Sequence, residues 1–140
     1  MLAAVGHPKG NKYHALSKQY CGVTYHSALE AGQAAELDLR VKAGELVRWE
    51  RQNKIEMYVY GMKVATYFID FVLYFPDGTR EFLECKGLEL PAWQLKWALF
   101  EALVAGWWKG EGHPDHAICR AMMDGQPVAS CLGDRLRVVR

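Results

Sequence analysis

The chain lacks most of the features that mark secreted, membrane-spanning or strongly charged proteins. It has four cysteines, which are scattered and give no disulfide framework, and no apolar run long enough to cross a bilayer. Its start lacks the basic segment and the long apolar segment of a signal peptide. The formal net charge is only +1, so any nucleic-acid-binding surface must come from local clusters of lysine and arginine. We therefore expect a cytoplasmic protein with reduced cysteines and no membrane partner.

The composition is that of a folded domain. Hydrophobic residues make up 51% of the 140 positions and charged residues 24%, which argues against a disordered chain. Five tryptophans, seven tyrosines and five phenylalanines can fill a core. A chain of this size, with no internal repeat and no convincing boundary, predicts a single domain over residues 1–140, with a loose arm over residues 1–19.

Two segments carry the start and stop signals of helices. Ser27 and Glu30 form the S-x-x-E pattern of a capping box, and apolar residues then recur at helical spacing until Gly44. Pro91 suits the first turn of a second helix, where proline costs no hydrogen bond. We therefore predict helices over residues 28–43 and 91–106 and, from a weaker pattern, a short helix over residues 114–123.

Segments rich in β-branched and aromatic residues predict the strands. The clearest are two strands joined by Pro76-Asp77-Gly78, which is typical of a three-residue hairpin loop with Gly78 in a left-handed conformation. The predicted strands are residues 20–25, 46–50, 54–60, 66–75, 79–85 and 136–139.

The hairpin loop determines which residues face one another. With Phe75 opposite Thr79, Asp70 lies opposite Glu84, and such pairs have Cβ atoms about 4.5–5.5 Å apart on one face of the sheet. Lys86 follows Glu84 by two residues and so shares that face. We therefore predict two carboxylates and one ammonium group close together.

Opposed carboxylates are unfavourable unless a positive charge lies between them, and Mg²⁺ suits such oxygen ligands. We predict that Asp70, Glu84 and the main-chain carbonyl of Cys85 bind Mg²⁺, for which Mn²⁺ can substitute. Lys86 would orient the attacking water or stabilise negative charge on the phosphoryl oxygens. The alternative is a solvated group of charges on an exposed sheet face. Asp70 interrupts an apolar strand, and Gly87 allows a close approach, and both details favour the site.

Seven short motifs follow one another along the chain: Asn11-Lys12-Tyr13, Ser27-Ala28-Leu29-Glu30-Ala31, Ala43-Gly44-Glu45, Glu50-Arg51-Gln52, Tyr67-Phe68-Ile69-Asp70-Phe71, Glu84-Cys85-Lys86-Gly87 and Lys96. Each is weak alone, but their order is more specific. Together they resemble the PD-(D/E)xK nuclease superfamily, and most closely a family of small phage-encoded nucleases described as Holliday-junction resolvases. The layout also resembles that of phage endonuclease I, in which an acidic helix residue precedes the same hairpin.

The resemblance implies an α/β fold of the restriction-endonuclease type, with a mixed central sheet flanked by helices. It implies that Glu30 is an additional catalytic acid, although Glu30 serves the capping box equally well. By the same resemblance Gln94 and Lys96, in the second helix, face the site or the DNA phosphates. Lys12, in the arm, is a further candidate for phosphate contact, and a solvated charge is the alternative for any such residue. Residues 107–140 exceed the family pattern and are expected as a C-terminal extension.

That extension contains four residues whose types suit a zinc site. These residues follow the spacing H-x2-H-x2-C-x11-C, and they are His113, His116, Cys119 and Cys131. Their type and number suit structural Zn²⁺, but the spacing is not that of a standard finger. The alternative is two surface histidines and two buried thiols.

Three functions remain open at this point. The first is a Mg²⁺-dependent endodeoxyribonuclease, acting on branched DNA such as Holliday junctions in phage recombination or packaging in the host cytoplasm, or nicking or processing ends. Two symmetric cuts in a junction suggest a homodimer. The second is a non-catalytic DNA-binding or virion component that retains the nuclease fold, and the third is a zinc-stabilised interaction protein. Asp70, Glu84 and Lys86 favour the enzyme, because a binding-only protein has no need of opposed carboxylates.

Overall fold

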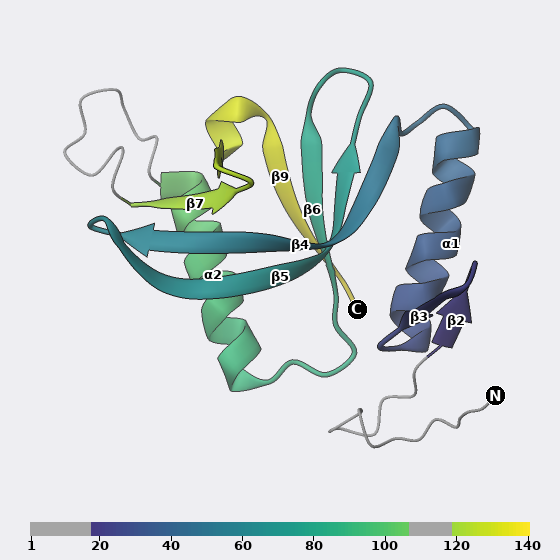
Figure 1. The fold of residues 1–140 in the computed structure, drawn as a ribbon, viewed down its shortest axis with the longest axis horizontal. Coiled ribbons are helices and arrows are strands. Elements are labelled where there is room, and N and C mark those ends of the chain that lie inside the picture. Colours follow the sequence, from purple (N-terminus) through teal and green to yellow (C-terminus); the bar gives the residue numbers. More distant parts are fainter. Residues whose placement is uncertain (1–17, 107–118) are drawn as a thin grey trace. The chain divides into compact units, whose positions relative to one another are not determined.

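The computed structural model describes residues 18–106 and 119–140, which fall into two compact units on either side of Glu45. The N-terminal unit has a short hairpin and one helix. The C-terminal unit, from Leu46 onwards, has a six-stranded mixed sheet and one long helix (Figure 1). The prediction of a mixed α/β protein is confirmed at this level. In the part of the chain that is described, no helix is long and apolar enough to cross a membrane.

The helix of the N-terminal unit, α1 (Ala28–Lys42), forms where the capping box predicts it. The Ser27 hydroxyl oxygen accepts a hydrogen bond from the Glu30 N–H at 3.2 Å, and the Glu30 carboxylate accepts one from the His26 N–H at 3.4 Å. Gly44 has φ +81°, a left-handed conformation that glycine adopts without steric cost, and the helix ends just before it. The helix prediction is therefore confirmed.

A hairpin of two short strands, β2 (Lys18–Tyr20) and β3 (Val23–Tyr25), precedes α1. The prediction of one continuous strand over residues 20–25 is wrong. Cys21 and Gly22 both have left-handed backbones, with φ +51° and +79°, and these two residues form the turn that separates the strands.

Six strands form one curled sheet in the C-terminal unit (Figure 1). Neighbouring strands are antiparallel except for β6 and β9, which run parallel. Residues 119–140, expected as a C-terminal extension, supply three of the strands and so belong to the sheet. The order across the sheet is β8 (Gln126–Val128), β7 (Arg120–Met123), β4 (Arg48–Val59), β5 (Met62–Tyr74), β6 (Arg80–Cys85) and β9 (Asp134–Val139).

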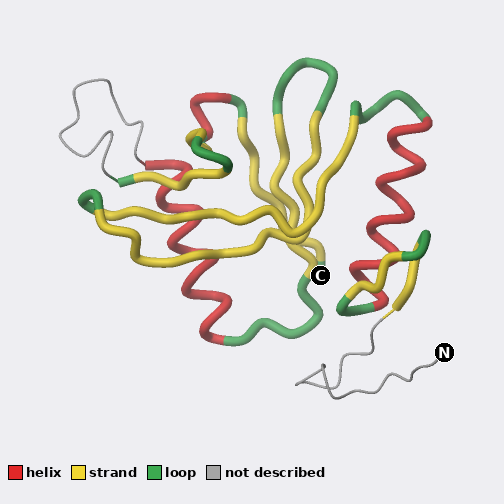
Figure 2. Tube along the Cα trace, viewed as in Figure 1, coloured by secondary structure: helices red, strands yellow, loops and turns green. Residues whose placement is uncertain are grey.

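The second helix, α2 (Pro91–Gly106), begins at the proline as predicted and lies along the sheet (Figure 2). Its buried side chains form one cluster with residues of five strands. Burying such side chains removes apolar surface from water, which is the main stabilising contribution to folding. The fully buried members of the cluster are Ile55, Met57, Ile69, Val72, Phe82, Phe100, Ala121 and Val128.

The first long strand departs from the prediction. Segments 46–50 and 54–60 are predicted as two strands, but β4 runs through both as one. Gln52, in the middle, has φ +56°, and this left-handed residue interrupts the regular alternation of side chains along the strand. Tyr60 and Gly61, with φ +50° and +76°, form the two-residue turn that leads into β5.

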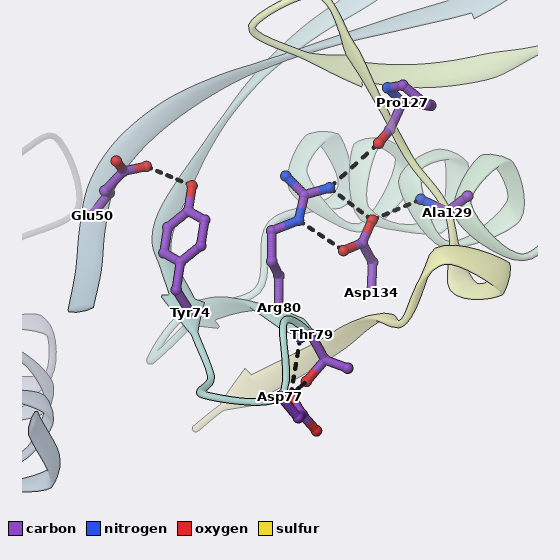
Figure 3. Close-up of polar contacts among 8 residues, drawn as sticks. All are labelled: Glu50, Tyr74, Asp77, Thr79, Arg80, Pro127, Ala129 and Asp134. Carbon is purple, nitrogen blue, oxygen red and sulfur yellow. Dashed lines mark hydrogen bonds and ion pairs between the residues drawn. The ribbon is translucent and has the colours of Figure 1, made fainter. Parts of the chain in front are cut away.

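The β5–β6 hairpin forms as predicted. The Phe75 N–H donates to the Thr79 carbonyl at 3.0 Å, and Val72 pairs with Phe82. The Asp77 carboxylate closes the turn by accepting hydrogen bonds from the Thr79 N–H at 2.9 Å and the Thr79 hydroxyl at 2.6 Å (Figure 3). The pairs from Tyr74–Arg80 to Phe71–Leu83 therefore have the register expected from this turn.

The region after α2 differs from its prediction. A short helix over residues 114–123 is wrong for the described part, because β7 is a strand that pairs with the far end of β4. This pairing joins segments more than sixty residues apart, so no local pattern indicates it. The predicted strand over residues 136–139 is confirmed within β9, which begins at Asp134.

An ion pair of Arg80 with the buried carboxylate of Asp134 joins the first residues of the two parallel strands (Figure 3). Arg80 donates to both oxygens of Asp134, at 2.8 and 2.9 Å, and also to the Pro127 carbonyl at 3.3 Å. The Ala129 N–H donates to the same carboxylate at 3.0 Å. Asp134 is 4% exposed, so its charge is buried but fully matched by hydrogen-bonded partners.

Candidate active site

Asp70 on β5 and Glu84 on β6 lie opposite each other, as the hairpin register predicts. The backbone pairing of the two strands ends at Phe71 and Leu83, one residue before these acids. Beyond these residues, each carboxylate accepts a hydrogen bond from a main-chain N–H of the opposite strand. Glu84 Oε1 accepts from the Asp70 N–H at 3.3 Å, and Asp70 Oδ2 accepts from the Cys85 N–H at 2.9 Å. The two acids are 8% and 2% exposed, so both are buried.

Burial makes the charged form of Glu84 costly. Burial first, and then the negative charge of Asp70, raise the pKa of Glu84 from 4.5 to about 7. The Tyr67 hydroxyl, the Lys86 ammonium group and the Asp70 N–H act in the opposite direction and do not offset this rise. A cation bound between the two acids would favour the ionised form of Glu84.

Lys86 shares the face of Glu84, as predicted. Its Nζ lies 3.3 Å from Glu84 Oε2 and 5.3 Å from the centroid of the Trp93 ring, near the start of α2. Its main-chain N–H donates to the Val139 carbonyl at 2.8 Å, which ties the end of β6 to β9. The two carboxylates and one ammonium group leave one net negative charge when all three are ionised.

A hydrogen-bonded chain supports Glu84 from the helix side. Trp93 Nε1 donates to the Tyr67 hydroxyl oxygen at 3.0 Å, and the Tyr67 hydroxyl is hydrogen-bonded to Glu84. Burial, followed by the negative charge of Glu84, raises the pKa of Tyr67. The hydroxyl therefore stays protonated and donates a hydrogen bond to the Glu84 carboxylate, which restricts the orientation of that side chain.

Gln52 is a site residue whose role sequence reasoning missed. It lies opposite Asp70, because the flanking pairs are Arg51 with Phe71 and Asn53 with Ile69. Its Nε2 lies 3.3 Å from Asp70 Oδ1, so the amide donates a hydrogen bond to the carboxylate. Gln52, Asp70 and Glu84 thus form a row across three adjacent strands. The Glu-Arg-Gln motif was a signal, but only the strand register reveals the contact.

The carboxylates suit Mg²⁺ as a donor set. Mg²⁺ sites commonly use one or two carboxylates and complete the shell with water and substrate phosphate. A carboxylate oxygen has two lone pairs, so a hydrogen bond to one does not prevent binding of a cation through the other. Among the described residues, no three histidine, cysteine, aspartate or glutamate side chains form a group that could hold a metal ion.

The other predicted residues are Glu30 in the N-terminal unit, Gln94 and Lys96 on α2, and Lys12. Glu30 belongs to the N-terminal unit, where the residue is 4% exposed and its carboxylate accepts a hydrogen bond from the His26 N–H. Gln94 and Lys96 are exposed in the first half of α2, and Lys96 Nζ donates to the Thr66 carbonyl at 3.2 Å. Lys12 lies outside the described residues. The catalytic and DNA-binding roles of these residues stay predictions.

Two of the four predicted zinc ligands, Cys119 and Cys131, lie among the described residues. Cys119 is partly buried against the core cluster, and Cys131 is exposed in η2 (Ser130–Leu132). His113 and His116 lie outside the described residues. The zinc site therefore stays a prediction.

Comparison of the chain with protein-family models, with curated proteins and with solved structures finds no match.

Proposed function

We propose that the protein is a Mg²⁺-dependent DNA endonuclease of the PD-(D/E)xK type, with a restriction-endonuclease-like fold. The observation that carries the proposal is the buried, opposed pair Asp70 and Glu84, with Lys86 in contact with Glu84. A protein that needed only stability would not gain from placing two carboxylates together in a buried position.

Each residue of the site has a separate role in phosphodiester hydrolysis. Asp70 and Glu84 hold Mg²⁺, with the main-chain carbonyl of Cys85 as a third candidate ligand. Bound there, Mg²⁺ supplies a water of lowered pKa and neutralises charge on the phosphate. The Lys86 ammonium group stabilises negative charge on the phosphoryl oxygens. Trp93 and Tyr67 hold Glu84 in place through their hydrogen bonds.

DNA is the proposed substrate, and branched DNA the proposed preference. Gln94 and Lys96 are exposed on α2. The same helix carries Trp93, whose ring centroid lies 5.3 Å from Lys86 Nζ. Phosphate contacts from such residues position a backbone without reading its sequence, and they make affinity fall with salt. A homodimer would supply two active sites for symmetric cuts in a junction.

The test is cleavage of end-labelled four-way junction, flap, linear duplex and single-stranded DNA, with and without Mg²⁺ or Mn²⁺. We expect metal-dependent cutting that is lost in Asp70→Asn and in Glu84→Gln. Glu81→Gln is the matched control, because Glu81 lies on the same strand but pairs with the partly exposed Arg137. Binding without cutting on every substrate would overturn the proposal and favour the non-catalytic DNA-binding protein.

A further inference from the structure

We propose that Gln52 is a positioning residue of this active site, which fixes the Asp70 carboxylate for metal binding without neutralising it. The inference rests on the proposed nuclease function. It is carried by two separate observations, the contact of Gln52 with Asp70 and the backbone conformation of Gln52.

The backbone conformation sets Gln52 apart from the other residues with left-handed backbones. Among the described residues, three other non-glycine residues have a positive φ, and each is followed by a glycine with positive φ in a turn: Cys21, Tyr60 and Asp124. Gln52 instead lies inside a twelve-residue strand, between residues that pair regularly with β5. Glutamine has no intrinsic preference for this conformation, and strained residues of this kind cluster at functional sites.

The strained residue coincides with a change in the alternation of the neighbouring strand. The side chains of β5 that belong to the core cluster are Tyr67, Ile69 and Val72. The spacing of two residues becomes three after Ile69, so the alternation of side chains toward the core shifts by one residue there. Asp70 lies within that interval, directly opposite Gln52. The irregularity on both strands thus occurs where the Gln52 amide meets the Asp70 carboxylate.

The chemistry of an amide suits this position. Gln52 is neutral, so it can donate a hydrogen bond to Asp70 Oδ1 without contributing a positive charge. An arginine or lysine there would pair with the carboxylate and compete with a metal cation. Gln52 therefore restricts the rotamer of Asp70 and leaves the negative charge of the site available to Mg²⁺.

Two substitutions separate positioning from a structural role. Gln52→Gly removes the amide and also relieves the backbone strain, so we expect its unfolding midpoint in urea to equal or exceed that of the wild type. Gln52→Met removes the amide but keeps the strain and the side-chain length. Asp124→Gly is the matched control, because it relieves the same left-handed strain in the β7–β8 turn.

The readouts are the Mn²⁺ concentration that half-saturates the protein and the metal dependence of cleavage. We expect both Gln52 variants to need about 10–100 times more Mn²⁺, although their stabilities differ, and Asp124→Gly to match the wild type. Cleavage should recover in part at high metal concentration.

Unchanged Mn²⁺ affinity and cleavage in a stable Gln52→Gly variant would overturn the inference and leave the nuclease proposal intact. Losses that follow the unfolding midpoint of each variant would also overturn it, because they indicate a structural role. A wild-type protein that neither binds Mn²⁺ nor cuts DNA would overturn the nuclease proposal and this inference with it.

Discussion

A buried carboxylate lies near each end of strand β6, and the two carboxylates have different charged neighbours. At its start, Arg80 forms two hydrogen bonds with Asp134, and the pair carries no net charge. Near its end, Glu84 faces a second acid, Asp70, and the single ammonium group of Lys86 lies 3.3 Å away. Glu84 and Asp134 are almost equally buried, at 2% and 4% exposure.

The difference shows that burial alone does not explain the second site. This sheet can satisfy a buried carboxylate with an arginine and main-chain groups, as it does at Asp134. At Glu84 it places the negative charge of Asp70 nearby instead, and burial together with that charge raises the pKa of Glu84 to about 7. Natural proteins retain such unfavourable arrangements mainly at functional sites.

The largest expected effect comes from breaking the matched pair. Arg80→Met would leave the Asp134 carboxylate buried without its partner, and we expect it to lower the free energy of unfolding by about 3–5 kcal/mol. Urea denaturation measures this loss. Arg137→Met is the control, because its pair with Glu81 is partly exposed and worth about 0–1 kcal/mol. Equal losses in the two variants would contradict the role of Arg80 as the partner that compensates the buried charge of Asp134.

Metal binding should depend on Asp70 and Glu84 and not on the ion pair of Arg80 with Asp134. At a Mg²⁺ concentration of about a hundred times its dissociation constant, we expect stabilisation by roughly 3 kcal/mol, seen as a higher melting temperature. Asp70→Asn should remove this gain, because it removes one of the two carboxylates. Asp134→Asn should retain it, although its melting temperature is lower throughout. A metal-dependent shift that survives in Asp70→Asn would place the cation elsewhere.

Neutralising Glu84 should stabilise the metal-free protein. Its pKa of about 7 in the folded state lies above the ordinary 4.5, so the ionised form costs folding free energy above pH 7 and that cost disappears as pH falls to about 4.5. We expect Glu84→Gln to raise the free energy of unfolding by roughly 1–3 kcal/mol at pH 8 and by almost nothing at pH 4.5.

Neutralising Asp134, the partner of Arg80, should have the opposite effect on stability. Asp134→Asn should destabilise the protein at pH 8, because it weakens a favourable ion pair. Chemical denaturation at the two pH values measures both variants. Destabilisation by Glu84→Gln at pH 8 would mean that Lys86 fully compensates the charge of Glu84.

The smallest expected effect concerns the support of Glu84. Tyr67 lowers the pKa of Glu84 through its hydrogen bond, so Tyr67→Phe should move the acidic limb of the pH–activity profile to higher pH. Cleavage should fall roughly two- to tenfold near pH 7 and recover at pH 9. Trp93→Phe, which removes only the donor to Tyr67, should give a smaller shift. An unchanged profile in both variants would exclude a role for this chain in Glu84 ionisation.

Local signals in the sequence predicted a large part of this fold. Ser27 and Gly44 marked the ends of α1, Pro91 marked the start of α2, and the turn at Asp77 set the register that opposes Asp70 to Glu84. Each of these signals acts within a few residues, through a cap, a fixed φ or a turn.

The missed features depend on non-local pairing. Counting back from the turn at Tyr60-Gly61 would place Arg51 opposite Asp70, but a register shift between Met57 and Tyr58 brings Gln52 there instead. A β-bulge of this kind has no clear signature in a single sequence. The strand β7, predicted as helix, likewise forms only because β4 supplies its partner.

The parallel pairing of β6 with β9 has a consequence for the order of events during synthesis. The strand that carries Glu84 gains its second neighbour from residues 134–139, about fifty positions later in the chain. Until the ribosome has released those residues, β6 is an open sheet edge and Arg80 has no buried partner. A nascent chain therefore lacks the strand that pairs with Glu84 until β9 has been translated. We expect any activity of this site to begin only after that point.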